Sequence, residues 1–332
     1  KGIGDTANVI GILPTADAAP STTIEWSGYV YAMVQHVGRQ DFWWGPGSAP
    51  YDTINTRAHL RVVGRTDTAV GEVGVRVNLR ASGWYGDVDS DPSFYSNEYW
   101  GWWAMTPELT LGGGYSGSLG NIGYGIDGAC TCWGTDWFAG DWRTNSPMYA
   151  LGAMNPGDTH QVRLSYASGP LSFGLALENS HGGSDGFALA GEMKYAGDAF
   201  NGEISAISWD DSPSAGGGWQ IGGGVAFNPS DMFSISLGAA TGEIWDSSES
   251  FMVVSGLVNI NLSDAVHAEL GAAYGEFDHN DQDNLTLLAG IYYSPVSQLT
   301  IGLEGQMNDV SNGGGPDYND FSTVDIVTVY NF

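Results

Sequence analysis

Runs of alternating apolar and polar residues recur along most of the chain. In the first, residues 23–36, one parity is apolar and the other polar: Ile24, Trp26, Val30 and Val34 against Glu25, Ser27, Tyr29 and Gln35. Successive side chains of a β-strand point to opposite faces, so such a run predicts a strand with one apolar and one wet face. About sixteen runs of this kind follow one another.

The charged side chains of two neighbouring runs, 56–66 and 70–82, fall on one parity only. Those polar positions are Arg57, His59, Arg61, Arg65, Glu72, Arg76, Asn78 and Arg80. A short turn, Asp67-Thr68-Ala69, joins the runs, so five of the ten Lys and Arg residues share one face of one hairpin. If that face met lipid, each Arg at mid-depth would cost roughly 2–4 kcal/mol. The face must therefore meet water, and the Val and Leu face must meet lipid or a core.

The connections between the runs alternate in length. Short turns near residues 106–107, 168–169, 229–230, 263–264 and 294–296 alternate with long acidic or Gly-rich stretches at 37–53, 83–97, 210–216, 246–249, 278–283 and 308–320. Short turns at one rim and long loops at the other are typical of outer-membrane barrels, and a β-sandwich does not sort its loops in this way. The pattern predicts an all-β fold, a transmembrane antiparallel β-barrel of about sixteen strands.

We assign residues 23–332 to this barrel and residues 1–22 to an N-terminal extension. Aromatic residues near the ends of the runs predict girdles at the two membrane interfaces. They are Trp26, Trp100, Trp102, Tyr274, Tyr292, Tyr293 and Tyr330.

One stretch, about residues 118–157, interrupts the alternation. Its sequence runs through Asp127, the Cys130-Thr131-Cys132 triplet, Asp136 and Asp141 without a regular pattern. A structureless insertion of this length in a tight β pattern is usually functional. We predict that this third long loop folds into the lumen and sets the width of a pore.

Composition narrows the classes of function. The formal net charge is −28, from 38 acidic residues against 10 Lys and Arg, and 50 residues are Gly. A chain this acidic repels nucleic-acid phosphates, which excludes a nucleic-acid binder. The sequence contains no run of about eighteen apolar residues, which is the pattern that predicts a transmembrane helix. The excess of acids also predicts a preference for cations over anions.

The candidate chemical groups are few. Cys130 and Cys132 form a local disulfide in an oxidising compartment, or are incidental loop thiols. The six His residues are scattered, so we predict no enzyme activity and no cofactor. Asp278, Asn280 and Asp283 faintly resemble a structural Ca²⁺ loop that lacks the turn glycine, and a hydrated acidic loop is the other interpretation.

The last run, with Val324, Ile326, Thr328, Tyr330 and the final Phe332, resembles the barrel-assembly signature of outer-membrane proteins. With the strand count, the chain resembles a bacterial general porin, and more narrowly the alphaproteobacterial porins of the rhizobial and Brucella type. The segments that carry this likeness are 10–14, 27–30, Arg57, Arg61, 64–68 with Gly71, and 97–98. The family commonly has a cysteine before the Gly-Tyr-Val strand, where this chain has Thr22-Thr23, so no family disulfide is carried over.

The resemblance implies a homotrimer of barrels in the bacterial outer membrane, in contact with lipopolysaccharide and its divalent cations and inserted by the barrel-assembly machinery through Phe332. It also implies a basic wall that faces acids on the inserted loop across a narrow point. The basic wall here is Arg57, His59, Arg61, Arg65, Arg76 and Arg80, and the loop acids are Asp127, Asp136 and Asp141. A plain solvated lumen wall and an external acidic loop are the alternatives for the two sets.

These expectations converge on a water-filled channel for passive diffusion of small hydrophilic solutes and ions, with cations preferred. One alternative is a substrate-specific porin, for example for sugars, in which Tyr29 and Tyr31 bind the solute. Another is a surface β-sandwich adhesin.

Overall fold

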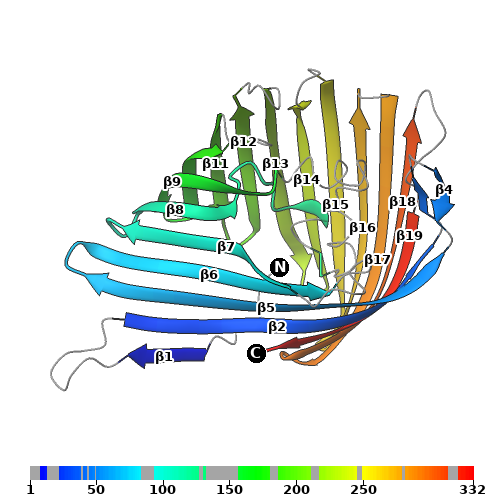
Figure 1. Ribbon diagram of the computed structural model, residues 1–332, viewed down its shortest axis with the longest axis horizontal. Helices are drawn as coiled ribbons and strands as arrows, with labels where there is room; N and C mark the ends of the chain where they lie inside the picture. The colour runs from blue at the N-terminus through cyan, green and yellow to red at the C-terminus, as the bar shows by residue number, and fades with distance from the viewer. Residues whose placement is uncertain are drawn as a thin grey trace.

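The computed structural model describes residues 8–12, 22–38, 40–42, 45–48, 50–83, 93–126, 130–131, 156–179, 186–210, 217–244, 249–278, 281–312 and 321–332. Sixteen strands of this described part form one closed antiparallel sheet (Figure 1). In order round the ring they are β2 (Thr22–Val37), β5 (Tyr51–Thr68), β6 (Gly71–Gly83), β7 (Ser93–Ala104), β8 (Leu109–Gly117), β9 (Asp158–Ser168), β10 (Leu171–Asn179), β11 (Phe187–Ala196), β12 (Phe200–Trp209), β13 (Gly218–Ser230), β14 (Phe233–Ile244), β15 (Glu249–Ser263), β16 (Val266–Phe277), β17 (Gln282–Val296), β18 (Leu299–Asn312) and β19 (Phe321–Asn331).

The ring closes where β19 pairs with β2, from Thr323 opposite Val37 to Asn331 opposite Tyr29. Next to this seam, the Phe332 amide donates to the Gly28 carbonyl at 3.0 Å, and the Gly28 amide donates to the Phe332 carbonyl at 3.2 Å. A closed sheet has no edge strands, and two separate packed sheets are therefore excluded. The predicted sixteen-stranded barrel is confirmed, and the β-sandwich alternative is wrong.

Three short strands stand apart from the ring. β1 (Asn8–Ile12) pairs with the first residues of β2, where Ile12 is opposite Thr22 and Asn8 is opposite Trp26. It therefore uses the edge of β2 that β19 leaves unpaired (Figure 1). β3 (Gln40–Phe42) and β4 (Gly45–Ser48) form a hairpin within the connection from β2 to β5.

Each strand has an apolar outer face and a mixed inner face. On β2, β5 and β6, Val34, Ile54 and Val75 are 53%, 69% and 57% exposed, whereas their neighbours of the opposite parity are buried or half-buried. Soluble proteins rarely expose contiguous apolar surface of this extent. The alternation in the sequence arises because one face of the sheet meets an apolar environment and the other encloses the interior.

The two rims differ as the sequence predicted. Seven connections at one rim are only two to four residues long, 69–70, 105–108, 169–170, 197–199, 231–232, 264–265 and 297–298, and the connections at the other rim are mostly longer. No helix of the described residues is long and apolar enough to cross a membrane.

The prediction of outward girdle aromatics is right for some residues and wrong for others. Trp26, Tyr293 and Tyr330 are exposed on the outer face. Tyr292 is fully buried and pairs across the sheet with His267 and Gly302 of the inner face. Trp100 and Trp102 also point inward, for the reason given below.

Candidate functional site

The register of β5 and β6 places all six side chains of the predicted basic wall on the inner face. Arg57 and His59 stand opposite Tyr31 and Tyr29 of β2, and Arg61 stands opposite Ser27. On the other side, Arg80 is opposite His59. Arg76, opposite Val63, lies two residue pairs nearer the short-turn rim than the Arg61–Asn78 pair, and Arg65, opposite Gly74, lies two pairs beyond Arg76.

Two of the arginines are neutralised by carboxylates. The Arg65 Nη1 atom lies 2.6 Å from the Glu25 Oε1 atom, and Arg76 forms an ion pair with Glu98. Arg65 also lies over the ring of Trp102, at 6.0 Å from its centroid. The Trp102 ring fills the space beside Gly74, and Trp102 Nε1 donates to Glu72 at 2.9 Å. Glycine on the neighbouring strand thus lets an inward indole lie flat along the wall.

Arg61 and Arg80 differ from the other arginines of the wall. Within the described residues, neither makes a hydrogen bond or an ion pair, and the Nε atom of each is buried without a partner. Both side chains are half-buried, so their guanidinium ends remain open to the interior. We call Arg61 and Arg80 the open arginines.

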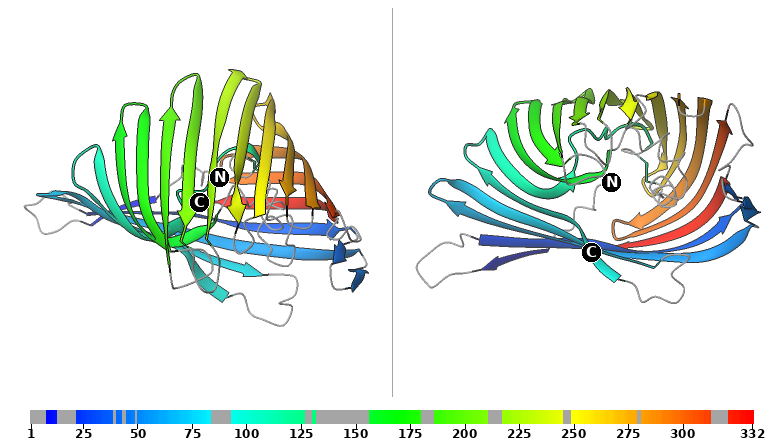
Figure 2. Two further views of the ribbon diagram at one scale, coloured as in Figure 1. Left: turned by 90° about the horizontal axis from the view of Figure 1, so that it is seen from above. Right: turned by 45° about the horizontal axis from the view of Figure 1, so that its top comes forward.

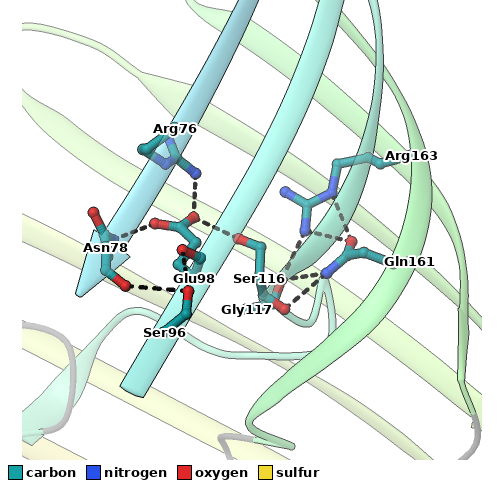
Figure 3. A network of polar contacts seen from close by, with 8 residues as sticks. All are labelled: Arg76, Asn78, Ser96, Glu98, Ser116, Gly117, Gln161 and Arg163. Atoms are coloured by element: carbon teal, nitrogen blue, oxygen red, sulfur yellow. Dashed lines mark hydrogen bonds and ion pairs between the residues drawn. The ribbon is translucent and has the colours of Figure 1, made fainter. Parts of the chain in front are cut away.

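Glu98 organises the wall next to the open arginines (Figure 3). Its carboxylate accepts hydrogen bonds from Arg76, from Asn78 and, at 2.7 Å, from the Ser116 hydroxyl. The strand β7 reaches this position through an irregularity in its pairing with β6, between Asn78 and Leu79. A bulge of this kind re-aims a side chain, and here it accompanies a carboxylate among cations.

Figure 3 also shows how β9 holds the end of β8. Gln161 Nε2 donates to the carbonyls of Ser116 and Gly117 at 3.0 and 2.9 Å, and Arg163 Nη2 donates to the Gly117 carbonyl at 2.7 Å. The Arg163 guanidinium lies 5.3 Å from the centroid of Trp100, another inward indole. The chain leaves the sheet from this fixed point.

The chain after β8 crosses the inner wall (Figures 1 and 2). We call residues 118–126 with 130–131 the inserted segment. Its apolar side chains fit where the wall has glycine. Leu119 and Ile126 each lie within 3.0 Å of the place that a Cβ atom on Gly174 or Gly271, respectively, would occupy. Leu119, Ile122 and Ile126 are each about 1% exposed, within three apolar clusters of β10–β12, β14–β16 and β15–β17.

Polar side chains of the wall accept hydrogen bonds from the backbone amides of the inserted segment. Leu119 N donates to Glu178 at 2.8 Å, Gly123 N to Glu203, and Thr131 N to both oxygens of Glu269 at 3.0 and 2.9 Å. The amides of Gly125 and Ile126 donate to Ser236 and Ser255, each at 2.9 Å. A hydrogen bond from a backbone amide to a charged acceptor is stronger than one to a neutral acceptor. The segment is therefore clamped along its length.

The ends of the excursion are tied together as well. Ser118 N donates to the Gly157 carbonyl at 2.9 Å, and Gly157 N donates to Asn121 Oδ1 at 3.0 Å. Gly157 has a φ of 93°, in the region that favours glycine. The chain thus enters and leaves the interior at one place.

The inserted segment and the basic wall lie on opposite sides of the ring. β5 and β6 are the second and third strands counted from β2, whereas β13 and β14, near the middle of the inserted segment, are the tenth and eleventh of sixteen. Positions eight strands apart in a ring of sixteen face one another across the interior. The geometry brings the basic wall opposite a wall thickened by the inserted segment.

Other predicted residues are only partly described. Asp127, Asp136, Asp141, Cys132 and Asn280 lie outside the described residues, so the acid half of the predicted pair and the calcium loop stay predictions. Cys130 is buried and disulfide-bonded. Asp278 accepts hydrogen bonds from Ser250, and among the described residues no group of three or more His, Cys, Asp or Glu could hold a metal ion.

The sequence analysis gave no role to the acids that hold the inserted segment, Glu178, Glu203 and Glu269, and Glu98 entered it only within the segment 97–98 that carries the family resemblance. The alternation along each strand places all four carboxylates on the inner face, so their orientation could have been predicted from the sequence. The partner of each, a backbone amide of the inserted segment or a side chain of another strand, has no signature in the sequence.

No protein-family model matches the chain, and no curated protein matches its sequence. Solved structures do match. The outer membrane channel DcaP of Acinetobacter baumannii is 13% identical with a TM-score of 0.72, over 96% of this chain and 100% of that one. An anion-selective porin from Comamonas acidovorans is 11% identical with a TM-score of 0.69, over 94% and 100%.

The Salmonella typhi OmpF complex with daunomycin is 9% identical with a TM-score of 0.67, over 94% of this chain and 98% of that one. At these identities the likeness concerns the fold, which is that of bacterial outer-membrane porins and channels. The narrower likeness to alphaproteobacterial porins is not tested by it.

Proposed function

We propose that this protein is a porin of the bacterial outer membrane, a water-filled channel through which small hydrophilic solutes and ions diffuse passively. One observation carries the proposal: β5 and β6 point five arginines into a closed ring, while aliphatic side chains of the opposite parity, such as Val75 and Val77, are exposed outside. The outer aliphatic side chains are stable in contact with lipid, and the inner arginines are stable in contact with water. The structural neighbours, which are porins and channels, support this proposal.

The interior supports a selective constriction. Cations of β5 and β6 face the wall that carries the inserted segment, and Asp127, Asp136 and Asp141 belong to the same excursion of the chain. Opposed charges across a narrow point orient polar solutes and their water, whereas an apolar solute loses hydration there without compensation. The proposal therefore predicts passage of small polar solutes and exclusion of apolar ones.

Two features act on ion selectivity in opposite directions. The chain has 38 acidic residues against 10 Lys and Arg, which favours cations in the channel as a whole. The open arginines favour anions locally. We keep cation preference as the proposed net result, since the acids outnumber the two open guanidinium groups by far.

A sugar-specific porin with Tyr29 and Tyr31 as binding platforms has no comparable support. Tyr29 is 9% exposed and Tyr31 is fully buried, packed with Met33, Val327 and Val329. Rings buried in a wall do not offer a face to a passing solute.

The assembly belongs to the same proposal. We propose a homotrimer that contacts lipopolysaccharide, with Ca²⁺ bridging its acidic loops, and insertion by the barrel-assembly machinery through Phe332. The Phe332 ring is half-exposed at the seam with β2.

Reconstitution in planar bilayers tests the proposal. We expect discrete conductance steps in KCl that scale with salt concentration, and a reversal potential in a salt gradient with the sign of cation preference. Absence of conductance from folded, inserted protein would contradict the channel. A reversal potential of the opposite sign would contradict only the cation preference.

A further inference from the structure

We propose that Trp100 and Trp102 form a stacking platform for the rings of a small linear oligosaccharide that passes through the lumen. The proposal rests on the channel function above and names a class of neutral solute that the channel retains briefly on its way through.

Both indoles lie with one face on the wall. Three consecutively bonded atoms of the Trp102 ring lie within 3.0 Å of the place that a Cβ atom on Gly74 would occupy. Three consecutively bonded atoms of Trp100 lie in the same way on Gly112. With three bonded atoms at that range, each ring meets its glycine by its face and not by its edge. The opposite face of each ring is therefore turned toward the interior.

Both rings can be reached from the lumen. Trp100 and Trp102 are half-buried and so keep solvent-accessible surface, whereas the inward tyrosines of β2 are buried. The guanidinium carbons of Arg163 and Arg65 lie 5.3 and 6.0 Å from the centroids of the two indoles. Stacked groups in contact lie about 3.5–4.0 Å apart. Neither ring is therefore covered by a stacked guanidinium.

The register sets the distance between the two rings. Gly74, Trp102 and Gly112 are directly opposite one another on β6, β7 and β8. Adjacent strands are about 4.8 Å apart, so the two glycines, and the rings that lie on them, are roughly 10 Å apart. A single sugar ring cannot cover both indoles, whereas a short linear chain of sugar rings can contact both at once.

Polar groups flank the two rings and favour a sugar. Glu72 accepts a hydrogen bond from Trp102 Nε1 at 2.9 Å, and Arg65, paired with Glu25, lies beside the same ring. Arg163 lies beside the other ring. Hydroxyl groups both donate and accept, so a sugar can bond to the carboxylates and to the guanidinium groups. The negative face of an indole attracts the C–H groups that a sugar ring presents.

Current recordings from single channels test the platform. Maltotriose is added to channels in KCl, and polyethylene glycol of equal size is the control, because it is neutral and polar but has no ring. We expect interruptions or excess current noise that rise with the maltotriose concentration, and a featureless decrease of the current with polyethylene glycol. No interruptions or noise with maltotriose, or the same response to both solutes, would overturn the platform.

Adenosine separates sugar binding from the stacking of any flat ring. It stacks on indoles but reaches only one of the two rings and offers few hydroxyl groups. We expect its apparent affinity to be at least about fivefold weaker than that of maltotriose. Equal or tighter binding of adenosine would overturn the assignment to oligosaccharides.

Substitutions locate the effect. We expect W100L/W102L to lower the apparent affinity for maltotriose at least about tenfold, and W100F/W102F, which keeps a smaller ring on each glycine, to lower it about threefold. Trp103→Leu is the matched control, because Trp103 is exposed on the outer face of the same strand, and we expect a change of less than about twofold. Equal effects of W100L/W102L and Trp103→Leu would overturn the location.

A second comparison applies if W100L/W102L does not fold. W100F/W102F is then compared with Trp103→Phe, and we expect a loss of about threefold against none. The same affinity in both variants would overturn the location.

Tryptophan fluorescence reports on the platform independently of conductance. We expect maltotriose to change the emission of the detergent-solubilised barrel, and this change to be lost in W100F/W102F and kept in Trp103→Phe. Conducting channels with neither interruptions nor a change in emission refute the platform and leave the porin. A change in emission that depends on Trp100 and Trp102, in a protein that never conducts, supports the sugar site and refutes the porin.

Discussion

On the wall formed by β5 and β6, the open arginines have no partner among the described residues. Across the ring, on β10 to β16, the four inward carboxylates that the structure describes are engaged: Glu178, Glu203 and Glu269 accept hydrogen bonds from backbone amides of the inserted segment, and Glu192 pairs with Lys194 at 2.6 Å. The carboxylates on β10 to β16 hold the inserted segment in place, whereas the open arginines on β5 and β6 are available to solutes.

The comparison explains how an acidic protein can present positive charge to its interior. A carboxylate that accepts hydrogen bonds from amides has its charge partly compensated at short range, whereas an unpaired guanidinium keeps its field. Net charge is therefore a poor guide to local charge in this barrel. What counts is which charged groups are engaged.

The largest expected effect comes from removing the wall carboxylates that accept hydrogen bonds from the inserted segment. The double variant E203A/E269A leaves the part-buried amides of Gly123 and Thr131 without acceptors, at a cost below the roughly 1–3 kcal/mol of a fully buried donor. We expect the inserted segment to detach intermittently, so that single-channel currents become several-fold noisier.

Glu192→Ala is the control for this experiment, since among the described residues Glu192 accepts no hydrogen bond from the inserted segment, although its partner Lys194 also lies 3.6 Å from Glu203. We expect its currents to be as quiet as those of the unaltered protein. Quiet currents from E203A/E269A would show that the carboxylates do not hold the segment.

The next effect concerns the open arginines. We expect R61Q/R80Q to shift the reversal potential toward cations by about threefold in permeability ratio, because two unscreened charges leave the wall. The shift should shrink as ionic strength rises, since screening reduces the field that the arginines contribute. A shift independent of salt would contradict an electrostatic origin.

A smaller effect of opposite sign is expected from Glu98→Gln. The amide keeps the shape of the side chain but no longer neutralises Arg76, so the wall gains one effective positive charge. We expect a shift of about twofold toward anions in the same reversal-potential measurement. A shift toward cations would mean that Glu98 does not shape the charge of this wall.

The smallest effect is expected from Arg65→Gln. Arg65 and Glu25 are about one-third exposed, 35% and 30%, and such a pair contributes little, of the order of 0–1 kcal/mol. We expect thermal stability to stay within measurement error of the unaltered protein, and the reversal potential to shift toward cations by less than about twofold, because the Arg65–Glu25 pair is more exposed than the Arg76–Glu98 pair. A large change in either would show that the wall acts as one coupled network.

The fold was predictable from the sequence because its physical cause is local. Period-two alternation follows directly from the geometry of a strand between lipid and water, and it placed Arg57, Arg61 and Arg80 on one face. The interior was less predictable. Gly74 and Gly112 each leave room for an indole of β7, which turns Trp102 and Trp100 inward, and no pattern within β7 itself reports on glycines of its neighbours.

The clamp was unpredictable for a related reason. Glu178 and Leu119 are 59 residues apart in sequence, and Glu269 and Thr131 are 138 apart. Backbone amides are present at nearly every residue, so the choice of donor depends on where the packing of Leu119 and Ile126 places the chain. That packing depends in turn on small residues of several strands, which become neighbours only when the ring forms.

The pairing of β19 with β2 has a consequence for how the molecule is made. Thr323 and Val37 meet although nearly the whole polypeptide separates them. Contacts of such long range form slowly, because the chain must give up much of its freedom before they bring any gain. Until β19 is delivered, β2 presents a bare row of amides and carbonyls that invites pairing with other chains. A truncated chain lacking β19 would therefore remain prone to aggregation and become a substrate for chaperones and proteases, and it would not form a pore.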